Sequence, residues 1–291
     1  FFRPPLGPTT APGGCCPPLA MGSTPEDVRA TVATFYGRIG AGGSRCCPTP
    51  TSDAALGAVM ADPHATAVRL GYDKEALRGL PEGANLGLSC GNPGAIASLP
   101  EGATVLDLGS GAGFDAFLAA SKVGPTGRVI GVDMAPEMLA RARGIAQAHG
   151  RAHVEFRLGE IEHLPVADRS IDVVISNCVL NLSPEKLQVF TEVFRVLRPG
   201  GRLVLADPVV CVAPGGSGAA PGPQDRPLDA DAYCSCISGA ITVPEYRTML
   251  FMAGFTDIAI EVDEDSREVI ADWVVGSGVE QWLVSAKITA V

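Results

Sequence analysis

From residue 104 onward, short apolar runs alternate along the chain with amphipathic segments. The apolar runs have the length of buried strands and are Val105–Leu108, Val129–Val132, Val154–Leu158, Ile171–Ser176 and Leu203–Ala206. Among the segments between them, Pro136–Ala148 and Pro184–Leu197 carry apolar residues at helical spacing. Near-continuous apolar strands that alternate with helices are typical of a parallel sheet covered on both faces. The pattern predicts a doubly wound, Rossmann-like α/β fold with a mostly parallel sheet and right-handed crossovers.

The N-terminal region divides into a tail and a helix. Residues 1–22 are rich in Pro, Gly and Thr, so we expect them to form a disordered tail. Thr24 is a good N-cap and is followed by Pro25, and apolar residues recur at helical spacing from Val28 to Ile39. We therefore expect a helix that begins after Thr24 and ends at the glycines that follow Ile39.

The C-terminal region is interrupted by a stretch rich in Gly and Pro. Residues 212–230 are expected to form a mobile loop, and a helix at Pro244–Ala253 should follow. Further strands are expected at Asp257–Val262 and Trp282–Ile288. The organisation that we predict has three parts: the tail at 1–22, an N-terminal helix and nucleotide-binding domain at 23–208, and a smaller C-terminal region at 209–291.

Composition narrows the class of protein. The 291-residue chain carries 32 acidic and 22 basic residues, which gives a formal net charge of −10. Such a charge repels nucleic-acid phosphates and anionic membranes, and no apolar run approaches the roughly 20 residues of a membrane helix. We therefore expect a globular enzyme with neither nucleic acid nor a membrane as its partner. We also expect it to be a monomer.

The strongest local motif is a glycine-rich turn after the first predicted strand. The strand leads into Gly109-Ser110-Gly111-Ala112-Gly113, which opens a helix. Its glycines permit close approach of the backbone, and the amides of a helix N-terminus favour an anionic group. Twenty residues beyond Gly113, Asp133 ends the second strand and can bridge two ribose hydroxyls. The strand, the glycines and the distal acid together predict a nucleoside-binding site.

Two features of this turn favour S-adenosylmethionine over a dinucleotide. The spacing is G-x-G-x-G rather than G-x-G-x-x-G. Asp107 stands before the turn, where it would repel a pyrophosphate but could accept a hydrogen bond from an ammonium group.

These segments resemble the successive motifs of the class I methyltransferases, which use S-adenosylmethionine. The resemblance is carried by Leu106–Gly113, by Gly131-Val132-Asp133-Met134 and by Gly159–Pro165. It implies that Glu160 approaches the adenine amino group and that the Ile161 backbone approaches the ring edge. The cofactor-binding residues expected on this basis are Asp107, Gly109, Ser110, Gly111, Gly113, Asp133, Met134, Glu160, Ile161 and Asn177.

The chain has nine cysteines, which is many for an enzyme of this size. Their number is odd and their spacing is unlike a disulfide framework, so we expect reduced thiols in a reducing compartment, the cytoplasm. No C-x-x-C pair exists, and the four histidines lack ligand spacing, which argues against zinc. Widely separated single thiols instead suit a soft, thiophilic centre with few ligands.

One cysteine, Cys178, follows the fourth predicted strand. It stands at the C-terminal edge of the sheet, where doubly wound folds bind ligands. A single cysteine is more often a small buried residue, but this location favours a functional role. Other thiols that could converge on it lie in loops: Cys90, Cys234 and Cys236, with Cys46 and Cys47 after the first helix.

Together these segments resemble the arsenite methyltransferase family from about Val28 to Ala290. The most specific segments are Leu86–Pro93, Ile175–Ser183 and Cys236–Ala240. The resemblance implies that Cys90, Cys178 and Cys236 bind arsenic(III) and serve the catalysis. Either Cys46 or Cys47 would match a further cysteine used in thiol exchange or substrate relay, while Cys234 has no counterpart.

The activity that this resemblance implies is the methylation of arsenite to methylated arsenicals, which detoxifies arsenic. Thiolate-bound arsenic(III) keeps a lone pair that can attack the sulfonium methyl in line, and S-adenosyl-L-homocysteine is then the product. No proton has to leave the nucleophile, so alignment and desolvation are what the enzyme supplies. The resemblance also implies a thiol reductant, glutathione or thioredoxin, that resets oxidised cysteines.

Two other functions stay open at this point. A methyltransferase for a carbon or oxygen acceptor, such as a quinone or sterol, would share the cofactor motifs but leaves three well-placed thiols unexplained. A metalloid-binding protein without turnover would use the thiols but has no need of Asp107 and Asp133.

Overall fold

The computed structural model describes residues 19, 23–42, 62–93, 98–212, 222, 230–272 and 278–291. Several sequence-based expectations fall outside these ranges. They are the conformation of the tail at 1–22 apart from residue 19, almost all of the predicted loop at 212–230, and Cys46 and Cys47.

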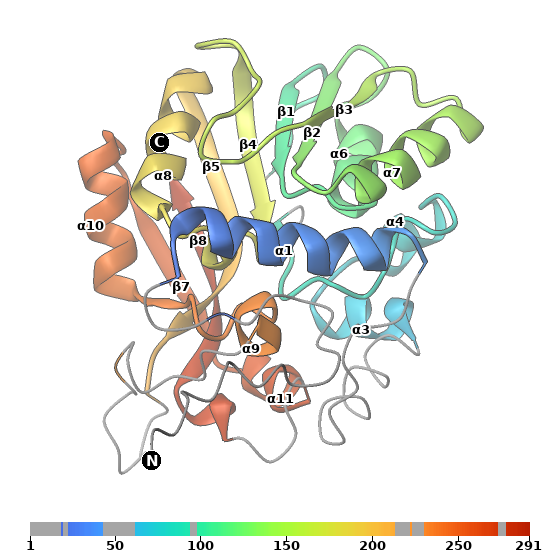
Figure 1. The fold of residues 1–291 in the computed structure, drawn as a ribbon. Helices are drawn as coiled ribbons and strands as arrows, with labels where there is room; N and C mark the ends of the chain where they lie inside the picture. The colour runs from blue at the N-terminus through green and yellow to red at the C-terminus, as the bar shows by residue number, and fades with distance from the viewer. Residues whose placement is uncertain are drawn as a thin grey trace, which may run out of the picture.

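A single twisted sheet forms the centre of the molecule (Figure 1). Its strands run in the order β3-β2-β1-β4-β5-β8-β7, and a short β6 pairs with β5. Only β8 runs against its neighbours β5 and β7 along this path, while the other pairings are parallel. The strands are β1 Thr104–Leu108, β2 Arg128–Asp133, β3 Val154–Leu158, β4 Ile171–Asn177, β5 Leu197–Val210, β6 Ile241–Thr242, β7 Ala259–Asp263 and β8 Leu283–Ala290.

Both faces of the sheet are covered by helices, which explains the near-continuous apolar strands. Alternate residues of β1 point to opposite faces. Leu106 packs in the apolar cluster that holds α8 and α10, whereas Val105 packs in the one that holds α6 and α7. These helices are α6 Phe114–Val123, α7 Pro136–Ala148, α8 Lys186–Val196 and α10 Val243–Ala253. The predicted doubly wound fold is therefore confirmed.

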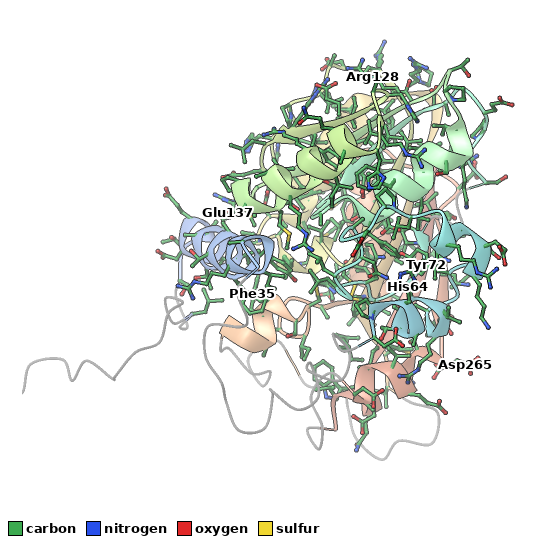
Figure 2. The ribbon with its side chains drawn as sticks, turned by 90° about the vertical axis from the view of Figure 1, so that its right-hand side faces the viewer. Phe35, His64, Tyr72, Arg128, Glu137 and Asp265 are labelled. Atoms are coloured by element: carbon green, nitrogen blue, oxygen red, sulfur yellow. A yellow bond between two sulfur atoms is a disulfide. The ribbon has the colours of Figure 1, made fainter. Side chains whose placement is uncertain are left out.

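The N-terminal helix α1, Pro25–Gly40, lies across the carboxyl ends of the parallel strands (Figure 1). It begins as the sequence predicts, because Thr24 and Asp27 form a reciprocal capping box. Its buried apolar face packs against α7, and the turned view in Figure 2 shows Glu137 of α7 next to this helix. At the far end of α1, Gly40 approaches the backbone of Met138 closely.

The remaining helices among the described residues are short, and the sequence did not predict them. They are α3 Pro63–Arg69, α4 Lys74–Arg78, α9 Ala230–Cys234 and α11 Ser266–Ala271, with single 3-10 turns at Leu180–Leu182 and Val279–Gln281. Each has too few residues for an apolar periodicity to show. The segment from 62 to 93 carries the Cys90 loop, and α9 leads directly into Cys236.

The fifth strand differs most from its prediction. Apolarity indicated only Leu203–Ala206, yet β5 begins at Leu197, the last residue of the predicted helix, and ends at Val210. The first part of β5 is exposed and polar, so no apolar run marks it. In the second part Asp207 and Pro208 interrupt the pattern, but β8 pairs with them as it does with their neighbours. The predicted domain boundary after residue 208 falls inside this strand, and that division stays a prediction.

The contact between α1 and α7 yields a test of the fold. In Gly40→Ala the new Cβ would lie 2.6 Å from the backbone nitrogen of Met138, so the two helices must separate. We expect the free energy of unfolding in urea to fall by about 1–3 kcal/mol. Gly144→Ala is the matched control, because that exposed position in α7 has open space around it and should gain about 0.5–1 kcal/mol. Equal changes in both variants would contradict the close crossing.

Candidate active site

The glycine-rich turn after β1 has the conformation that its sequence predicts. Gly109 and Gly111 have φ values of 64° and 51°, in the left-handed region that favours glycine. A Cβ on Gly109 would also lie 2.5 Å from a methyl carbon of Val179, which follows Cys178. Gly111 instead faces open space. The turn therefore touches the end of β4 on one side and lines a pocket on the other.

Asp107 lies at the base of this pocket with an unused hydrogen-bond acceptor. Its side chain is 2% exposed, and its Oδ2 atom has no hydrogen-bond partner among the described residues. Burial, together with the nearby carboxylates of Asp115 and Asp133, raises the pKa of Asp107 well above its usual range. A cationic ammonium group would relieve both the desolvation and the repulsion, so the residue fits the amino-acid end of S-adenosylmethionine.

Asp133 ties the end of β2 to the glycine-rich turn. Its carboxylate accepts a hydrogen bond from the backbone N–H of Gly111 at 2.9 Å and another from that of Ala135 at 2.8 Å. The residue lines the pocket, where its carboxylate can accept a further hydrogen bond. This position, one strand away from Asp107, suits the ribose hydroxyls of a nucleoside.

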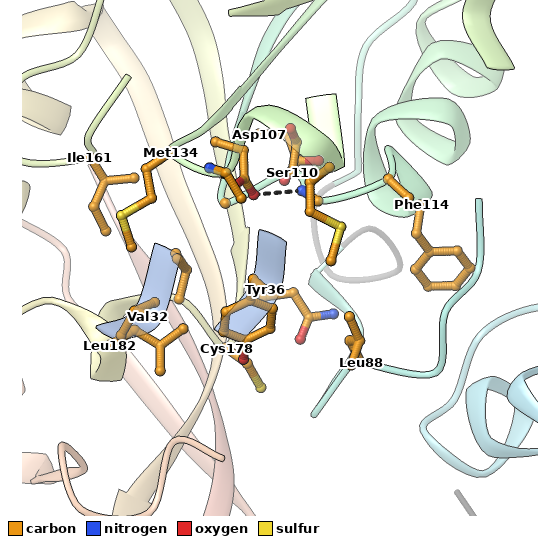
Figure 3. Close-up of a pocket in the computed structure, with 18 of the residues that line it drawn as sticks. Val32, Tyr36, Leu88, Asp107, Ser110, Phe114, Met134, Ile161, Cys178 and Leu182 are labelled. Carbon is orange, nitrogen blue, oxygen red and sulfur yellow. Dashed lines mark hydrogen bonds between the residues drawn. The ribbon is translucent and has the colours of Figure 1, made fainter. Parts of the chain in front are cut away.

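Apolar side chains supply much of the remaining lining, beside polar residues such as Arg29 and Asn177, and the pocket encloses about 1060 Å³ of space, part of it open to solvent. Figure 3 shows Met134 and Ile161 on one side and Val32 and Tyr36 of α1 covering another. Asp107 and Cys178 lie at opposite ends of this group in the same view. The pocket can hold a nucleoside with an amino-acid tail and reaches the fourth-strand cysteine.

Most of the predicted cofactor residues line this pocket, but two do not. Gly113 caps α6, and its neighbours there are the rings of Phe117 and Phe156. Glu160 is half exposed and lies 3.4 Å from the guanidinium of Arg29 on α1. The residues that line the pocket as predicted are Asp107, Gly109, Ser110, Gly111, Asp133, Met134, Ile161 and Asn177.

Glu162 is a pocket residue that the sequence reasoning missed. It is 2% exposed and accepts a hydrogen bond from the Ser183 hydroxyl at 2.5 Å. Arg29 lies 3.8 Å from the same oxygen of Glu162 and 2.9 Å from Glu185. The motif resemblance directs attention to positions 160 and 161, and nothing in the sequence distinguishes Glu162 from the polar residues beside it, Glu160 and His163.

The sulfur atoms of Cys90, Cys178 and Cys236 all lie within 4.8 Å of one another. We call these residues the thiol group. All are buried, and they come from the loop before β1, the end of β4 and the turn after α9. Their convergence is the arrangement that the sequence predicts for the arsenic ligands. Cys234 is also buried but is not a member of this group.

The expectation of reduced thiols is wrong for one pair in this structure. Cys90 and Cys178 form a disulfide, with a Cα–Cα distance of 5.9 Å that lies in the usual range for such bonds. The residues are 88 positions apart, so cysteine spacing could not reveal the pair. The third member, Cys236, keeps its thiol, which donates to the carbonyl oxygen of Cys178 at 2.8 Å.

The backbone is strained where two members of the thiol group sit. Cys178 and Cys236 have φ values of 59° and 62°, and only two other non-glycine residues of the described chain have positive φ. Such conformations cost on the order of 1–3 kcal/mol and persist only where the surroundings impose them. Here the turn after Cys236 is pressed against the 3-10 turn after Cys178, since any side chain at Gly239 would collide with the Asn181 carbonyl.

Burial also keeps Cys236 in its neutral form. The pKa of its thiol is raised well above the usual range, first by desolvation and then by the nearby carboxylate of Asp207. Asp207 is itself buried, which raises its pKa to about 7, and it accepts a hydrogen bond from the Tyr246 hydroxyl. The sulfur atoms that an incoming ligand meets in this structure are therefore neutral: the thiol of Cys236 and the disulfide of Cys90 and Cys178.

Comparison with known proteins agrees with this geometry. The family described as "Methyltransferase domain" matches residues 99–254. The arsenite methyltransferase of Halobacterium salinarum is 47% identical over 269 residues, which cover 91% of this chain and 67% of that enzyme. The arsenite methyltransferase of Aquipseudomonas alcaligenes is 39% identical over 180 residues, covering 57% of this chain and 48% of that one.

A solved structure shows the same relationship. CrArsM, an arsenic(III) S-adenosylmethionine methyltransferase from Chlamydomonas reinhardtii, matches with a TM-score of 0.52 and 32% sequence identity. The match covers 84% of this chain and 73% of that one. In the part of this chain that the structure describes, no helix has both the length and the apolar character needed to cross a membrane.

The fold, the glycine-rich turn and the two pocket acids define a class I S-adenosylmethionine-dependent methyltransferase. Within that class, the chain belongs to the arsenite methyltransferase family. It spans 67% of the length of the haloarchaeal relative and 48% of the length of the Aquipseudomonas one. The family predicted from the sequence is confirmed.

The buried carboxyl of Asp107 generates a prediction about cofactor affinity. Asp107→Asn should weaken S-adenosylmethionine binding by about 1–3 kcal/mol, because the ammonium loses a charged acceptor. Because its pKa is raised, Asp107 of the unliganded protein stays protonated at a higher pH than an ordinary aspartate does. It must lose this proton before it can form an ion pair with the ammonium group. The affinity of the unsubstituted protein should fall as the pH falls through this raised pKa.

Calorimetric titrations over a series of pH values check this prediction. Asp107→Asn should lose the pH dependence together with the affinity. Asp265→Asn removes the same charge from an exposed position and should change neither. Unchanged affinity in Asp107→Asn would remove this residue from the cofactor site.

Proposed function

We propose that this chain methylates trivalent arsenic held by the thiol group, with S-adenosylmethionine as the methyl donor. The observation that carries the proposal is the convergence of three sulfur atoms within 4.8 Å at the end of β4, beside the pocket that contains Asp107. Thiolate sulfur is the ligand that a soft, thiophilic centre prefers. A methyltransferase for a carbon or oxygen acceptor would have no use for such a group.

The pocket residues orient the cofactor. In the proposal Asp107 receives the ammonium group, Asp133 the ribose hydroxyls, and Met134 and Ile161 contact the adenine. When bound, S-adenosylmethionine supplies an electrophilic methyl group on a sulfonium centre. The apolar cover formed by Val32 and Tyr36 of α1 excludes water from this centre and so strengthens the local electrostatics.

The thiol group prepares the acceptor. Arsenite, As(OH)₃, condenses with the thiols of Cys90, Cys178 and Cys236 to give As(SR)₃ and three molecules of water. The arsenic keeps its lone pair, which forms the new bond to carbon, while the electron pair of the broken carbon–sulfur bond remains on the departing sulfur. The product of this transfer is a cationic methylarsonium at the arsenic(V) level. It returns to arsenic(III) when two of its sulfur ligands leave together as a disulfide, which supplies two electrons, and a further thiol or water then takes the open valence and releases a proton. No general base is required for the methyl transfer, so the protein contributes alignment and desolvation.

The proposal includes a thiol reductant. A disulfide between Cys90 and Cys178, as seen here, cannot bind arsenite until two electrons and two protons restore both thiols. Glutathione or thioredoxin supplies them and becomes a disulfide in turn. A cytoplasmic location, where such reductants are abundant, belongs to the same proposal, and the monomeric state stays a prediction.

Product analysis tests the function directly. The reduced protein is incubated with arsenite, glutathione and S-adenosylmethionine labelled in its methyl group, and the arsenic products are separated and counted. Labelled methylarsenicals are the expected products. Tight arsenite binding without transfer would identify a metalloid-binding protein instead, and label found only in organic acceptors would identify the other class of methyltransferase.

Cysteine substitutions separate the members of the thiol group from their neighbour. Cys178→Ser and Cys236→Ser should abolish methylation of arsenite, because a serine oxygen is a poor ligand for a soft centre. Both should keep their affinity for S-adenosylmethionine. Cys234→Ser is the matched control two residues from Cys236, and it should stay active since its sulfur is outside the group.

Cys90→Ser should affect the first methylation most. A methylated arsenic has one valence occupied by carbon, so only two thiols can bind it. A fully active Cys178→Ser protein, measured with arsenite and reduced glutathione, would refute the three-thiol acceptor site.

A further inference from the structure

Asn177 is joined by hydrogen bonds to both sides of Cys90. Its Oδ1 atom accepts from the backbone N–H of Cys90 at 3.1 Å, and its Nδ2 donates to the carbonyl oxygen of Gly91 at 2.9 Å. One side chain thus binds the peptide group before Cys90 and the peptide group after Gly91. Because Cys178 is the next residue in the chain, this amide connects the two cysteines of the disulfide through a short, directional path.

Two buried residues, Tyr72 and Asp115, fix the orientation of the same amide. Its Nδ2 also donates to the hydroxyl of Tyr72 at 2.9 Å and to Asp115 at 3.1 Å. The Tyr72 hydroxyl in turn donates to Asp115 at 2.8 Å. Tyr72 and Asp115 are 5% and 7% exposed, so water does not compete with these bonds. Both N–H hydrogens of Asn177 are therefore used within the protein.

The Cys90 loop is held on its other sides as well. The Ser285 hydroxyl of β8 donates to the Cys90 carbonyl oxygen at 3.0 Å. A Cβ on Gly91 would lie 2.6 Å from the Cβ of Ala206, so the loop rests directly on β5. Of the residues that hold the Cys90 loop in these contacts, Asn177 alone is the chain neighbour of Cys178.

We infer that Asn177 is a positioning residue that holds Cys90 against Cys178, with Tyr72 and Asp115 fixing the orientation of its amide. This role is separate from the cofactor contact that the sequence suggests for Asn177, which also lines the pocket. Its consequence for arsenite rests on the proposed function, because Cys90 is the thiol that only a three-ligand acceptor needs. The effect of Asn177 on disulfide formation does not depend on the proposed function, since Cys90 and Cys178 can be oxidised without arsenic.

Disulfide formation measures the positioning without arsenic. The fully reduced protein is mixed with oxidised glutathione, thiols are trapped at intervals, and the Cys90–Cys178 bond is followed by peptide mass analysis. Each bond formed consumes one glutathione disulfide and releases two molecules of glutathione. Asn177→Ala should slow ring closure by about tenfold, because the effective concentration of one thiol at the other falls.

Two further variants, one conservative and one a control, test whether the hydroxyl of Tyr72 contributes. Tyr72→Phe removes only the hydroxyl behind the amide, keeps the buried ring, and should slow ring closure by about two- to fivefold. Tyr246→Phe is the matched control, because its buried hydroxyl also bonds an aspartate, Asp207, but neither residue bonds Asn177 or the Cys90 loop. Its ring closure should proceed at the rate of the unsubstituted protein.

Cofactor affinity and substrate preference complete the experiment. Asn177→Ala and Tyr72→Phe should lower the rate with arsenite more than the rate with methylarsenite, while Tyr72→Phe keeps its affinity for S-adenosylmethionine. Ring closure at the unsubstituted rate in Asn177→Ala and Tyr72→Phe would overturn the inference. If Asn177→Ala does not fold, Tyr72→Phe alone decides it. An unsubstituted protein that does not methylate arsenite would refute the proposed function but leave the ring-closure result intact.

Discussion

The parallel pairing of β1 with β4 is the constraint on which both halves of the site depend. Their register places Leu108 beside Ser176, so the two strands end together. The chain therefore leaves β1 into the glycine-rich turn and leaves β4, which ends at Asn177, into Cys178 at the same edge of the sheet. The contact of Gly109 with Val179 shows how tightly these exits are packed. A methyl donor and a sulfur-bound acceptor can then be adjacent without any flexible connection between their binding residues.

The thiol group is suited to its substrate by charge as well as by softness. Its members are buried, and the pKa of Cys236 is raised by that burial, so a metal cation that needed several thiolates there would meet a large desolvation cost. Arsenite avoids the cost because neutral As(OH)₃ and neutral thiols give a neutral complex and water. The same burial excludes solvent from the nucleophilic lone pair. An apolar environment that would weaken a zinc site thus favours this chemistry.

The sequence predicts the frame of this molecule better than its details. Hydrophobic periodicity locates α7 and β3 with the bounds that the structure shows, since both elements bury a regular apolar pattern. It misses the exposed start of β5, where Leu197 pairs with Ile171 and the register then shifts before Arg202, because no apolar run marks that segment. Motif spacing places Asp107 and Asp133 in the pocket, as local turns largely determine them. The role of Asn177 and the Cys90–Cys178 bond depend on segments far apart in the chain, so no local pattern could reveal them.

X-ray absorption at the arsenic edge tests the central claim most directly, because it counts the atoms bound to arsenic in solution. The fully reduced protein, loaded with one equivalent of arsenite and no methyl donor, should show a first shell of three sulfur atoms and no oxygen. Cys90→Ser should show two sulfur atoms with one oxygen, while Cys234→Ser should match the unsubstituted protein. An arsenic shell that keeps two or three oxygen atoms in the unsubstituted protein would contradict the three-thiol acceptor site.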